Sequence, residues 1–286
     1  MRQSYSFGEV LLDCFEKKRL IGGAPLNFAW NLNQFGLPVS IVSAIGRDDD
    51  GLRLRQFVRE AGIDASYLME TTAPTGTVTV TVTDGEPEFL IDENAAWDHI
   101  DSDFSSLSCP GVVYFGTLAQ RSKPNRHSLS KLLGRGAELS FFDVNLRQQF
   151  YTDDMLLSGM KAADIVKFNE EEWEVAQHVT GEGTLEGLLE TYELQAVACT
   201  LGKRGAILVS RQGRYEAPAE EIPVVDTVGA GDAFSAALAA GWMRSADSAF
   251  ILRTACAAGK AVVQHAGGQI RLPEHVASAF GGGGAS

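Results

Sequence analysis

The sequence predicts an α/β fold built around a mostly parallel central sheet. Short apolar runs typical of buried strands alternate along the chain with longer segments of helical spacing, such as 39–46 followed by 52–62. Glycines at 22, 23, 229 and 231 lie at predicted turns into helices. The alternation is interrupted at 71–97, where a different pattern predicts a small separate β-sheet.

The composition is that of an ordinary globular protein and restricts the partners that we expect. The 286 residues are 45% hydrophobic and 21% charged, and their formal net charge is −13. This acidic balance argues against nucleic acid and anionic membrane surfaces as partners. No basic leader precedes an apolar run and no stretch of about 18 apolar residues occurs, so we expect a cytoplasmic protein. Four cysteines lie far apart without a CxxC pair, which predicts reduced thiols: Cys14, Cys109, Cys199 and Cys256.

An apolar run over 4–12 predicts the first strand, and Asp13 directly follows it. Because open α/β sheets bind ligands beyond the carboxyl ends of their strands, Asp13 is a candidate ligand contact. Taken alone, a polar residue that merely ends a strand is an equally good interpretation.

Two adjacent glycines, Gly22 and Gly23, precede a predicted helix with Pro25 in its first turn. Glycine allows the backbone to approach a ligand closely. Asn27 lies early on this helix, and its amide can both donate to and accept from sugar hydroxyls. By itself, however, the segment is only a turn into a helix.

The segment 77–83 alternates strictly between threonine and valine, which is typical of a half-exposed strand. Asp84-Gly85 predicts a tight turn, and 87–92 supplies the return strand. A hairpin inserted into an α/β chain predicts a small sheet of its own. A decorative hairpin at the edge of the main sheet is the alternative.

Arg147 follows the predicted strand 139–144, in a D-x-N-x-R pattern that begins at Asp143. Its forked guanidinium suits a phosphate or a sugar oxygen, although a surface salt bridge is nearly as good an interpretation. We interpret Asp143 as a structural residue that holds the loop.

Two later strands also end in polar residues. Asn169 and Glu172 open a helix after the strand 163–168, at a position where acidic residues usually complement the helix dipole. The strand 195–200 runs into a T-x-G-x-x-G turn formed by Thr200, Gly202 and Gly205. This turn is a weak signal when taken alone.

The strongest candidate site lies at the start of the segment 226–243. Gly229, Ala230 and Gly231 precede a predicted helix, whose free N–H groups and dipole favour an anion such as phosphate. Asp232 follows in the first turn, where it could accept a proton from a hydroxyl that attacks the phosphate. A simple helix cap is the alternative interpretation of Asp232.

These motifs resemble the two signatures of the PfkB, or ribokinase-like, family of carbohydrate kinases, and of its fructokinase-like branch. The resemblance spans about 7–268, with Gly22, Gly23 and Asn27 in the N-terminal signature and Asp13 in a GE-x-x-x-D pattern. It implies a ribokinase-like three-layer α/β/α sandwich with a mostly parallel central sheet and a small β-sheet lid. We expect a single domain over 1–280, a lid formed by about 14–22 and 71–97, and a flexible tail at 281–286.

The resemblance also assigns roles to the candidate residues. Asp232 would be the general base, and the amides of Gly229, Ala230 and Gly231 would form an anion hole. The expected sugar contacts are Asp13, Gly22, Gly23, Asn27 and Arg147. The expected ATP site comprises Asn169, Glu172, Thr200, Gly202 and Gly205. Glu172 would hold Mg²⁺ through water, and the candidate monovalent cation site, for K⁺, comprises Asp226 and Val228.

We therefore expect an ATP-dependent sugar kinase that transfers the γ-phosphate to a primary hydroxyl of a monosaccharide, with fructose as the first candidate. The alternatives are 2-keto-3-deoxygluconate kinase, ribokinase and, more distantly, a non-catalytic sugar-binding protein. The family also suggests a homodimer formed through the β lid. A nucleotide-dependent oxidoreductase is disfavoured because Phe234 stands where GxGxxG needs its third glycine, and no Walker GxxxxGK[ST] motif occurs.

Overall fold

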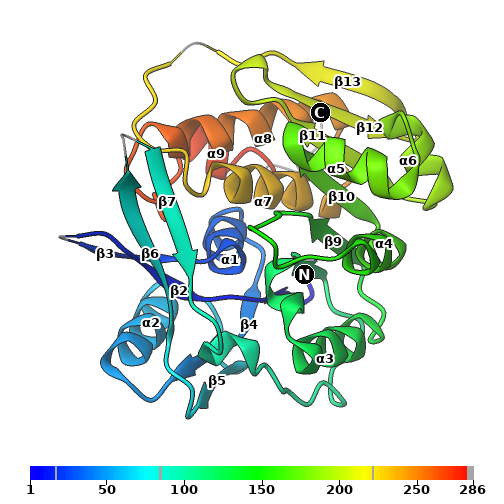
Figure 1. The fold of residues 1–286 in the computed structure, drawn as a ribbon. Coiled ribbons are helices and arrows are strands. Elements are labelled where there is room, and N and C mark those ends of the chain that lie inside the picture. Colours follow the sequence, from blue (N-terminus) through cyan, green and yellow to red (C-terminus); the bar gives the residue numbers. More distant parts are fainter. Residues whose placement is uncertain (17, 84–85, 221, 282–286) are drawn as a thin grey trace.

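A nine-stranded sheet forms the middle layer of the molecule, which is a computed structural model drawn as a ribbon in Figure 1. Seven strands that are adjacent in space, β5, β4, β1, β8, β9, β10 and β11, are parallel to one another. Strand β12 is antiparallel to both of its neighbours. The strands, in spatial order across the sheet, are β13 (Gly213–Ala217), β12 (Ala206–Ser210), β11 (Ala196–Thr200), β10 (Ile165–Asn169), β9 (Leu139–Asp143), β8 (Val112–Phe115), β1 (Ser4–Phe7), β4 (Val39–Gly46) and β5 (Leu68–Thr71).

The structure describes residues 1–286 except 17, 84–85, 221 and 282–286. The predicted tight turn at 84–85 and the predicted flexible tail beyond Gly281 therefore lie outside the described residues.

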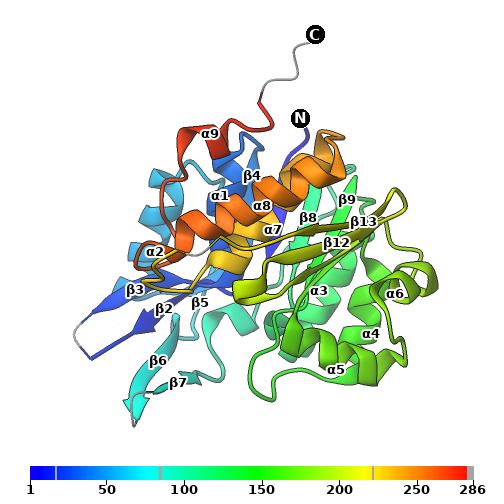
Figure 2. The same cartoon turned by 90° about the horizontal axis from the view of Figure 1, so that it is seen from above.

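Helices cover both faces of the large sheet, as the two perpendicular views show (Figures 1 and 2). One face carries α1 (Ala24–Gln34), α2 (Asp49–Glu60), α7 (Ala230–Met243) and α8 (Ser248–Val263). The other face carries α3 (Lys123–Leu133), α4 (Asp153–Ala162), α5 (Glu170–Thr180) and α6 (Leu185–Thr191). Shorter pieces complete the chain, namely η1 (Ala96–Asp98), η2 (Leu118–Arg121), η3 (Gly202–Arg204) and α9 (Glu274–Ala277).

The strands of the large sheet are buried on both faces. On β8 and β9, for example, Tyr114 and Phe141 point into one apolar cluster, and Phe115 and Phe142 point into the other. Because alternate side chains enter opposite layers, these strands read as continuous apolar runs in the sequence. The predicted three-layer α/β/α sandwich with a mostly parallel sheet is confirmed.

A separate four-stranded sheet stands beside the sandwich (Figure 2). Both segments expected to form the lid contribute to it, but it begins earlier than expected, at Leu11, and excludes Thr71, which pairs with Gly46 in the large sheet. That the small sheet acts as a lid remains a prediction. Its strands, in spatial order, are β3 (Arg19–Gly22), β2 (Leu11–Cys14), β6 (Gly76–Thr83) and β7 (Glu86–Ile91).

The prediction of one strand over 4–12 is wrong. The chain leaves the large sheet after Phe7 and enters the small sheet at Leu11. Gly8 lies at the break with φ of +143°, a conformation that other residues rarely adopt, and a Cβ atom there would lie 2.7 Å from Cγ of Pro25. Asp13 consequently lies inside β2 and does not follow a strand of the large sheet.

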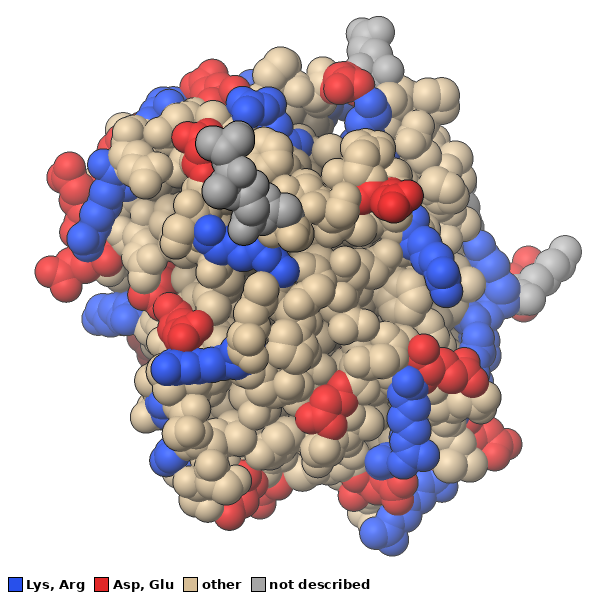
Figure 3. Space-filling view, turned by 180° about the vertical axis from the view of Figure 1, so that it is seen from behind, with Lys and Arg blue, Asp and Glu red and all other residues tan. Residues whose placement is uncertain are grey.

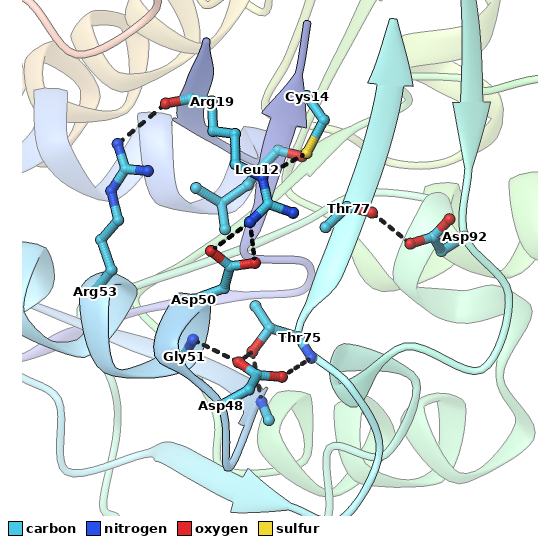
Figure 4. Close-up of polar contacts among 11 residues, drawn as sticks. Leu12, Cys14, Arg19, Asp48, Asp50, Gly51, Arg53, Thr75, Thr77 and Asp92 are labelled. Carbon is cyan, nitrogen blue, oxygen red and sulfur yellow. Dashed lines mark hydrogen bonds and ion pairs between the residues drawn. The ribbon is translucent and has the colours of Figure 1, made fainter. Parts of the chain in front are cut away.

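A set of polar contacts ties the small sheet to α2 (Figure 4). The Asp48 carboxylate accepts hydrogen bonds from Gly51 N at 2.7 Å, from Thr75 Oγ1 at 2.6 Å and from Thr75 N at 2.9 Å. Arg19 on β3 forms an ion pair with Asp50 on α2 at 2.6 Å. The small sheet is therefore anchored at β3 and just before β6.

A second anchor lies where β7 ends. Arg121 donates to both carboxylate oxygens of Asp98, at 2.8 and 2.7 Å, and to the backbone oxygen of Asp92. Its guanidinium carbon also lies 4.0 Å from the ring centre of Trp97 and 4.6 Å from that of Phe150. Arg121 thus connects the base of the small sheet to the loop that follows β9.

The surface carries both signs of charge. On the face turned away from the viewer of Figure 1, lysine and arginine side chains are interspersed with aspartate and glutamate (Figure 3). Among the described helices, none combines the length and the apolar character that crossing a membrane requires.

We predict that Arg121→Ala lowers the free energy of unfolding by about 3–5 kcal/mol, because the buried Asp98 carboxylate loses its cation. Urea unfolding of both proteins measures this difference. As a control, Arg214→Ala removes an exposed ion pair with Glu186 and should cost about 0–1 kcal/mol. Equal losses in the two variants would show that Arg121 is not an anchor.

Candidate active site

A cleft of about 2300 Å³ lies between the carboxyl ends of the central strands and the small sheet. Asp13 and Val78 line it from the small sheet, while Asn169 and Thr200 line it from the ends of β10 and β11. Open α/β sheets bind ligands beyond the carboxyl ends of their strands, so this cleft is the candidate active site.

The cleft brings together most of the residues singled out in the sequence. Gly22 and Asp226 are the two exceptions. A Cβ atom on Gly22 would lie 2.5 Å from Asp13 Oδ2, so this glycine makes room for the Asp13 carboxylate. The predicted residues that line the cleft are Asp13, Gly23, Asn27, Arg147, Asn169, Glu172, Thr200, Gly202, Gly205, Val228, Gly229, Ala230, Gly231 and Asp232.

The Asp226 carboxylate makes backbone hydrogen bonds in two loops. Its carboxylate accepts hydrogen bonds from Val228 N and from Gly267 N, both at 3.0 Å. The carboxylate therefore joins the segment before α7 to the loop that follows α8. A monovalent cation at Asp226 and Val228 remains a prediction.

Helix α7 starts with a residue that must be glycine. Gly229 caps the helix with φ of 81°, in the left-handed region, and a Cβ atom there would lie 2.4 Å from Cα of Gly268. In the part of the chain that the structure describes, Gly231 N and Asp232 N have no hydrogen-bond acceptor, whereas Ala230 N donates to Thr227 O at 3.3 Å. The first turn therefore offers free N–H donors and the positive end of the helix dipole to an anion.

Asp232 is buried in this first turn with 9% of its surface exposed. Asn27 Nδ2 donates to its Oδ2 at 2.8 Å, and Asn27 Oδ1 in turn accepts from Gln269 Nε2. Burial, followed by repulsion from Asp143, raises the pKa of Asp232 to about 6, although Asn27 and Lys167 oppose the rise. Asn27 thus holds the carboxylate in place, a contact that the sequence did not indicate.

Two further carboxyl groups line the small-sheet end of the cleft. Burial raises the pKa of Glu9 to about 7. Burial, with repulsion from Asp226, raises the pKa of Asp13 to about 6. The guanidinium of Arg147 lowers both values, so it lies close enough to act on both groups. The GE-x-x-x-D pattern includes Glu9, but sequence reasoning assigned it no role.

Asn169 and Glu172 form a capping box at the start of α5. Asn169 Oδ1 accepts from Glu172 N at 2.8 Å, and Glu172 Oε2 accepts from Asn169 N at 2.8 Å. Glu172 Oε1 also accepts from Leu146 N at 3.1 Å, which fixes the loop after β9. The sequence-based interpretation of this segment as a helix start is confirmed.

The same two side chains fit a magnesium ion that is held mainly by water and by nucleotide phosphates. Glu172 is buried at the cleft wall, and its carboxylate oxygens keep lone pairs beyond the hydrogen bonds described above. The described residues contain no cluster of three or more His, Cys, Asp or Glu side chains that could bind a metal alone. A sparse donor set of this kind suits Mg²⁺, which dehydrates reluctantly.

Lys167 is a cleft residue that sequence reasoning missed. It lies on β10 between the buried Val166 and Phe168, and its Nζ donates to Asp143 Oδ1 at 3.0 Å. Asp143 also accepts from Ser235 Oγ at 2.8 Å. A charged residue within an apolar strand was the available signal, and the apolar neighbours concealed it.

Comparison with known proteins identifies the class of protein. The pattern of the pfkB family carbohydrate kinases matches residues 2–275. The fold and the cleft thus describe a carbohydrate kinase, and the chain belongs to the pfkB family. It is an enzyme of the phosphotransferase class, as the sequence signatures predict.

Several of the relatives are fructokinases. Fructokinase-1 of Oryza sativa is 29% identical over 266 residues, which cover 82% of this chain and 80% of that protein. A sugar kinase from Pyrococcus horikoshii, solved in complex with ATP, is 26% identical with a TM-score of 0.78 and covers 93% of this chain and 94% of that one. A fructokinase from Vibrio cholerae in its fructose, ADP and calcium-bound form shares the fold, with 23% identity, a TM-score of 0.84, and 98% and 99% coverage.

We predict that Asp232→Asn stabilises the protein at neutral pH. A carboxyl group whose pKa rises from 3.8 to about 6 on folding binds its proton more tightly in the folded state, so stability is lost as pH rises through this range. At about 1.4 kcal/mol per pKa unit, the asparagine variant should gain up to about 3 kcal/mol in the free energy of unfolding at pH 7. The gain should vanish below pH 4.

Urea unfolding at a series of pH values measures this gain. The exposed Asp101→Asn variant is the matched control and should show no such growth with pH. A pH-independent difference between the wild type and Asp232→Asn would contradict the buried, ionisable environment of Asp232.

Proposed function

We propose that this kinase is an ATP-dependent fructokinase, which transfers the γ-phosphate of ATP to a primary hydroxyl of fructose. The observation that carries the proposal is the chemistry of the small-sheet end of the cleft, which we call the sugar end. Its walls come from the β1–β2 connection, β2, α1, β6, β7, η2 and the loop after β9. The charged members among its described residues are Glu9, Asp13 and Arg147.

A neutral sugar suits this end of the cleft. Asp13 and Asn27 can accept from and donate to sugar hydroxyls, and Leu11, Val78 and Ile91 offer apolar surface to the carbon skeleton. A sugar phosphate would bring negative charge toward the buried carboxyl group of Glu9 and the half-buried one of Asp13. The names of the fructokinase relatives support the same conclusion.

The proposed reaction uses the residues at the start of α7. Asp232 accepts the proton of the attacking hydroxyl while the sugar oxygen bonds to the γ-phosphorus and the bond to the β–γ bridging oxygen breaks. The free amides of Gly231 and Asp232 stabilise the charge on the transferred group, while Gly229 and Ala230 form the turn that presents them. The proton leaves Asp232 for solvent after ADP and the sugar phosphate depart.

The other half of the cleft takes the nucleotide in this proposal. Thr200, Gly202 and Gly205 border the space beside β12 and β13, and α8 closes it from the opposite side. Asn169 and Glu172 would hold the water shell of a magnesium ion, which neutralises phosphate charge when it is bound. The use of ATP is supported by the ATP-bound relative. Activation by K⁺ and a dimer formed through the small sheet remain predictions.

One observation favours a second candidate, 2-keto-3-deoxygluconate kinase. Arg147 lowers the pKa of Glu9, Asp13 and Asp232, so its guanidinium faces the sugar end, where it could also pair with the carboxylate of a sugar acid. Ribose has no comparable observation in its favour.

We predict that fructose gives the highest kcat/KM in an ADP-release assay with Mg-ATP, across fructose, ribose, 2-keto-3-deoxygluconate and fructose 6-phosphate. Asp13→Asn should raise the KM for fructose about tenfold or more, because a charge-assisted hydrogen bond is lost. Preference for 2-keto-3-deoxygluconate would replace the proposed substrate. An unchanged KM would remove Asp13 from the sugar site.

We predict that kcat/KM falls tenfold per pH unit below about pH 6, because protonated Asp232 cannot accept the hydroxyl proton. Asp232→Asn should lower kcat by about 10²–10⁴-fold and leave ADP affinity little changed. The inflection should persist in Asp13→Asn, which removes the Asp13 carboxyl group, whose pKa is also about 6. Loss of the inflection there would assign it to Asp13 instead.

A further inference from the structure

Lys167 is a buried ammonium whose position fits more than a structural role. It lies on β10 in register with Asp143 on β9, so the two side chains are neighbours on one face of the sheet. The Lys167 residue is 5% exposed, yet it lines the cleft. Among the described residues, Asp143 is the only hydrogen-bond partner of Nζ. An ammonium has three donors, so two remain without an acceptor.

The free side of this ammonium faces the start of α7. A Cβ atom placed on Gly231 would lie 3.2 Å from Lys167 Nζ, and Nζ is the nearest atom that it would meet. Glycine at this position therefore leaves the space between the helix turn and the ammonium open. Lys167 also acts electrostatically on Asp232, one residue further along.

Two positive features thus converge on one point. The N-terminus of α7 carries a partial positive charge, and the Lys167 ammonium adds a full one. Features of like sign repel each other in an empty protein, and a buried ion pair is in general no more stabilising than apolar residues of similar volume. An anion placed between them would be attracted both to the N-terminus of α7 and to the Lys167 ammonium.

We propose that Lys167 is a further catalytic residue, whose ammonium donates a hydrogen bond to an oxygen of the γ-phosphoryl group of ATP bound at the start of α7. Asp143 is the positioning residue that holds this ammonium. The inference rests on the proposed position of ATP in the cleft. Lys167 keeps its proton throughout, and only the phosphoryl group moves, from the β–γ bridging oxygen to the sugar oxygen.

Lys167 is protonated and positively charged at neutral pH. Burial alone would lower the pKa of the ammonium, but the carboxylates of Asp143 and Glu172 outweigh burial and raise the pKa above its ordinary value. The negative charge of a transferring phosphoryl group spreads over three oxygens, and the helix N–H groups approach them from one side. Lys167 supplies a donor from the β10 side of the same space.

Lys167→Met in the full chain is the first test, because it removes the charge and keeps the volume. We expect kcat to fall about 10²–10³-fold, as when one preorganised donor to a transition state is lost. The KM for the sugar should change little. The control Lys161→Met removes an exposed lysine of α4 outside the cleft and should leave kcat unchanged. A folded Lys167→Met enzyme with wild-type kcat would overturn the proposal.

A double variant separates catalysis from structure. Combining Lys167→Met with Asp143→Asn removes both charges, and the asparagine oxygen can still accept from Ser235. If the pair were only structural, the double variant would regain both folding and turnover. We expect it to fold, by urea unfolding, and to remain as slow as Lys167→Met. Restored turnover would overturn the proposal even if the single variant fails to fold.

A measurement of nucleotide binding tests the proposal without any sugar. Calorimetry compares ADP with the non-hydrolysable β,γ-imido analogue of ATP, both with Mg²⁺, in the wild type and the Lys167 variants. We expect the substitution to weaken the analogue about tenfold more than ADP, the size expected for a charged hydrogen bond. Equal weakening of the two would show that the ammonium does not contact the γ-phosphoryl group. Inactivity of the wild type toward fructose would change the proposed substrate and leave this comparison intact.

Discussion

The transfer of the chain from one sheet to the other between Phe7 and Leu11 is the constraint on which the site depends. Gly8 permits it, because only glycine readily takes the backbone angle found there. The transfer carries Glu9 to the rim of the large sheet and Asp13 into the small one. Without it, the cleft would lack the part of its second wall that Leu11 and Asp13 supply.

Around that wall the protein concentrates charge in buried positions. Burial raises the pKa values of Glu9, Asp13 and Asp232, and one guanidinium, that of Arg147, opposes the rise in all three. Groups of this kind cost free energy in an empty site and gain it back when a ligand supplies hydrogen bonds or countercharge. The cleft is therefore built for binding at some cost to stability, whereas the apolar clusters on the two faces of the large sheet stabilise the fold.

The sandwich was predictable because parallel strands buried on both faces are continuous apolar runs, and the signature residues that line the cleft follow such runs. The split of 4–12 into two strands was not, since hydropathy does not encode the backbone angle of Gly8. The role of Lys167 was not predictable for a related reason. Its partner Asp143 lies 24 residues away along the chain, and only the register of β9 and β10 brings the two together. The contact of Asn27 with Asp232 depends in the same way on helix packing.

The distance along the chain between Asn27 and Asp232, 205 residues, has a consequence for how the enzyme is made. Asn27 also contacts Gln269, and Gly229 packs against Gly268, so the site joins the first tenth of the chain to its last. During synthesis on the ribosome, Asn27 is made 205 residues before Asp232, so this part of the cleft cannot assemble until that later segment has emerged. In the proposed mechanism, a chain that ends before Asp232 has Asp13 and Asn27 but lacks the group that accepts the hydroxyl proton.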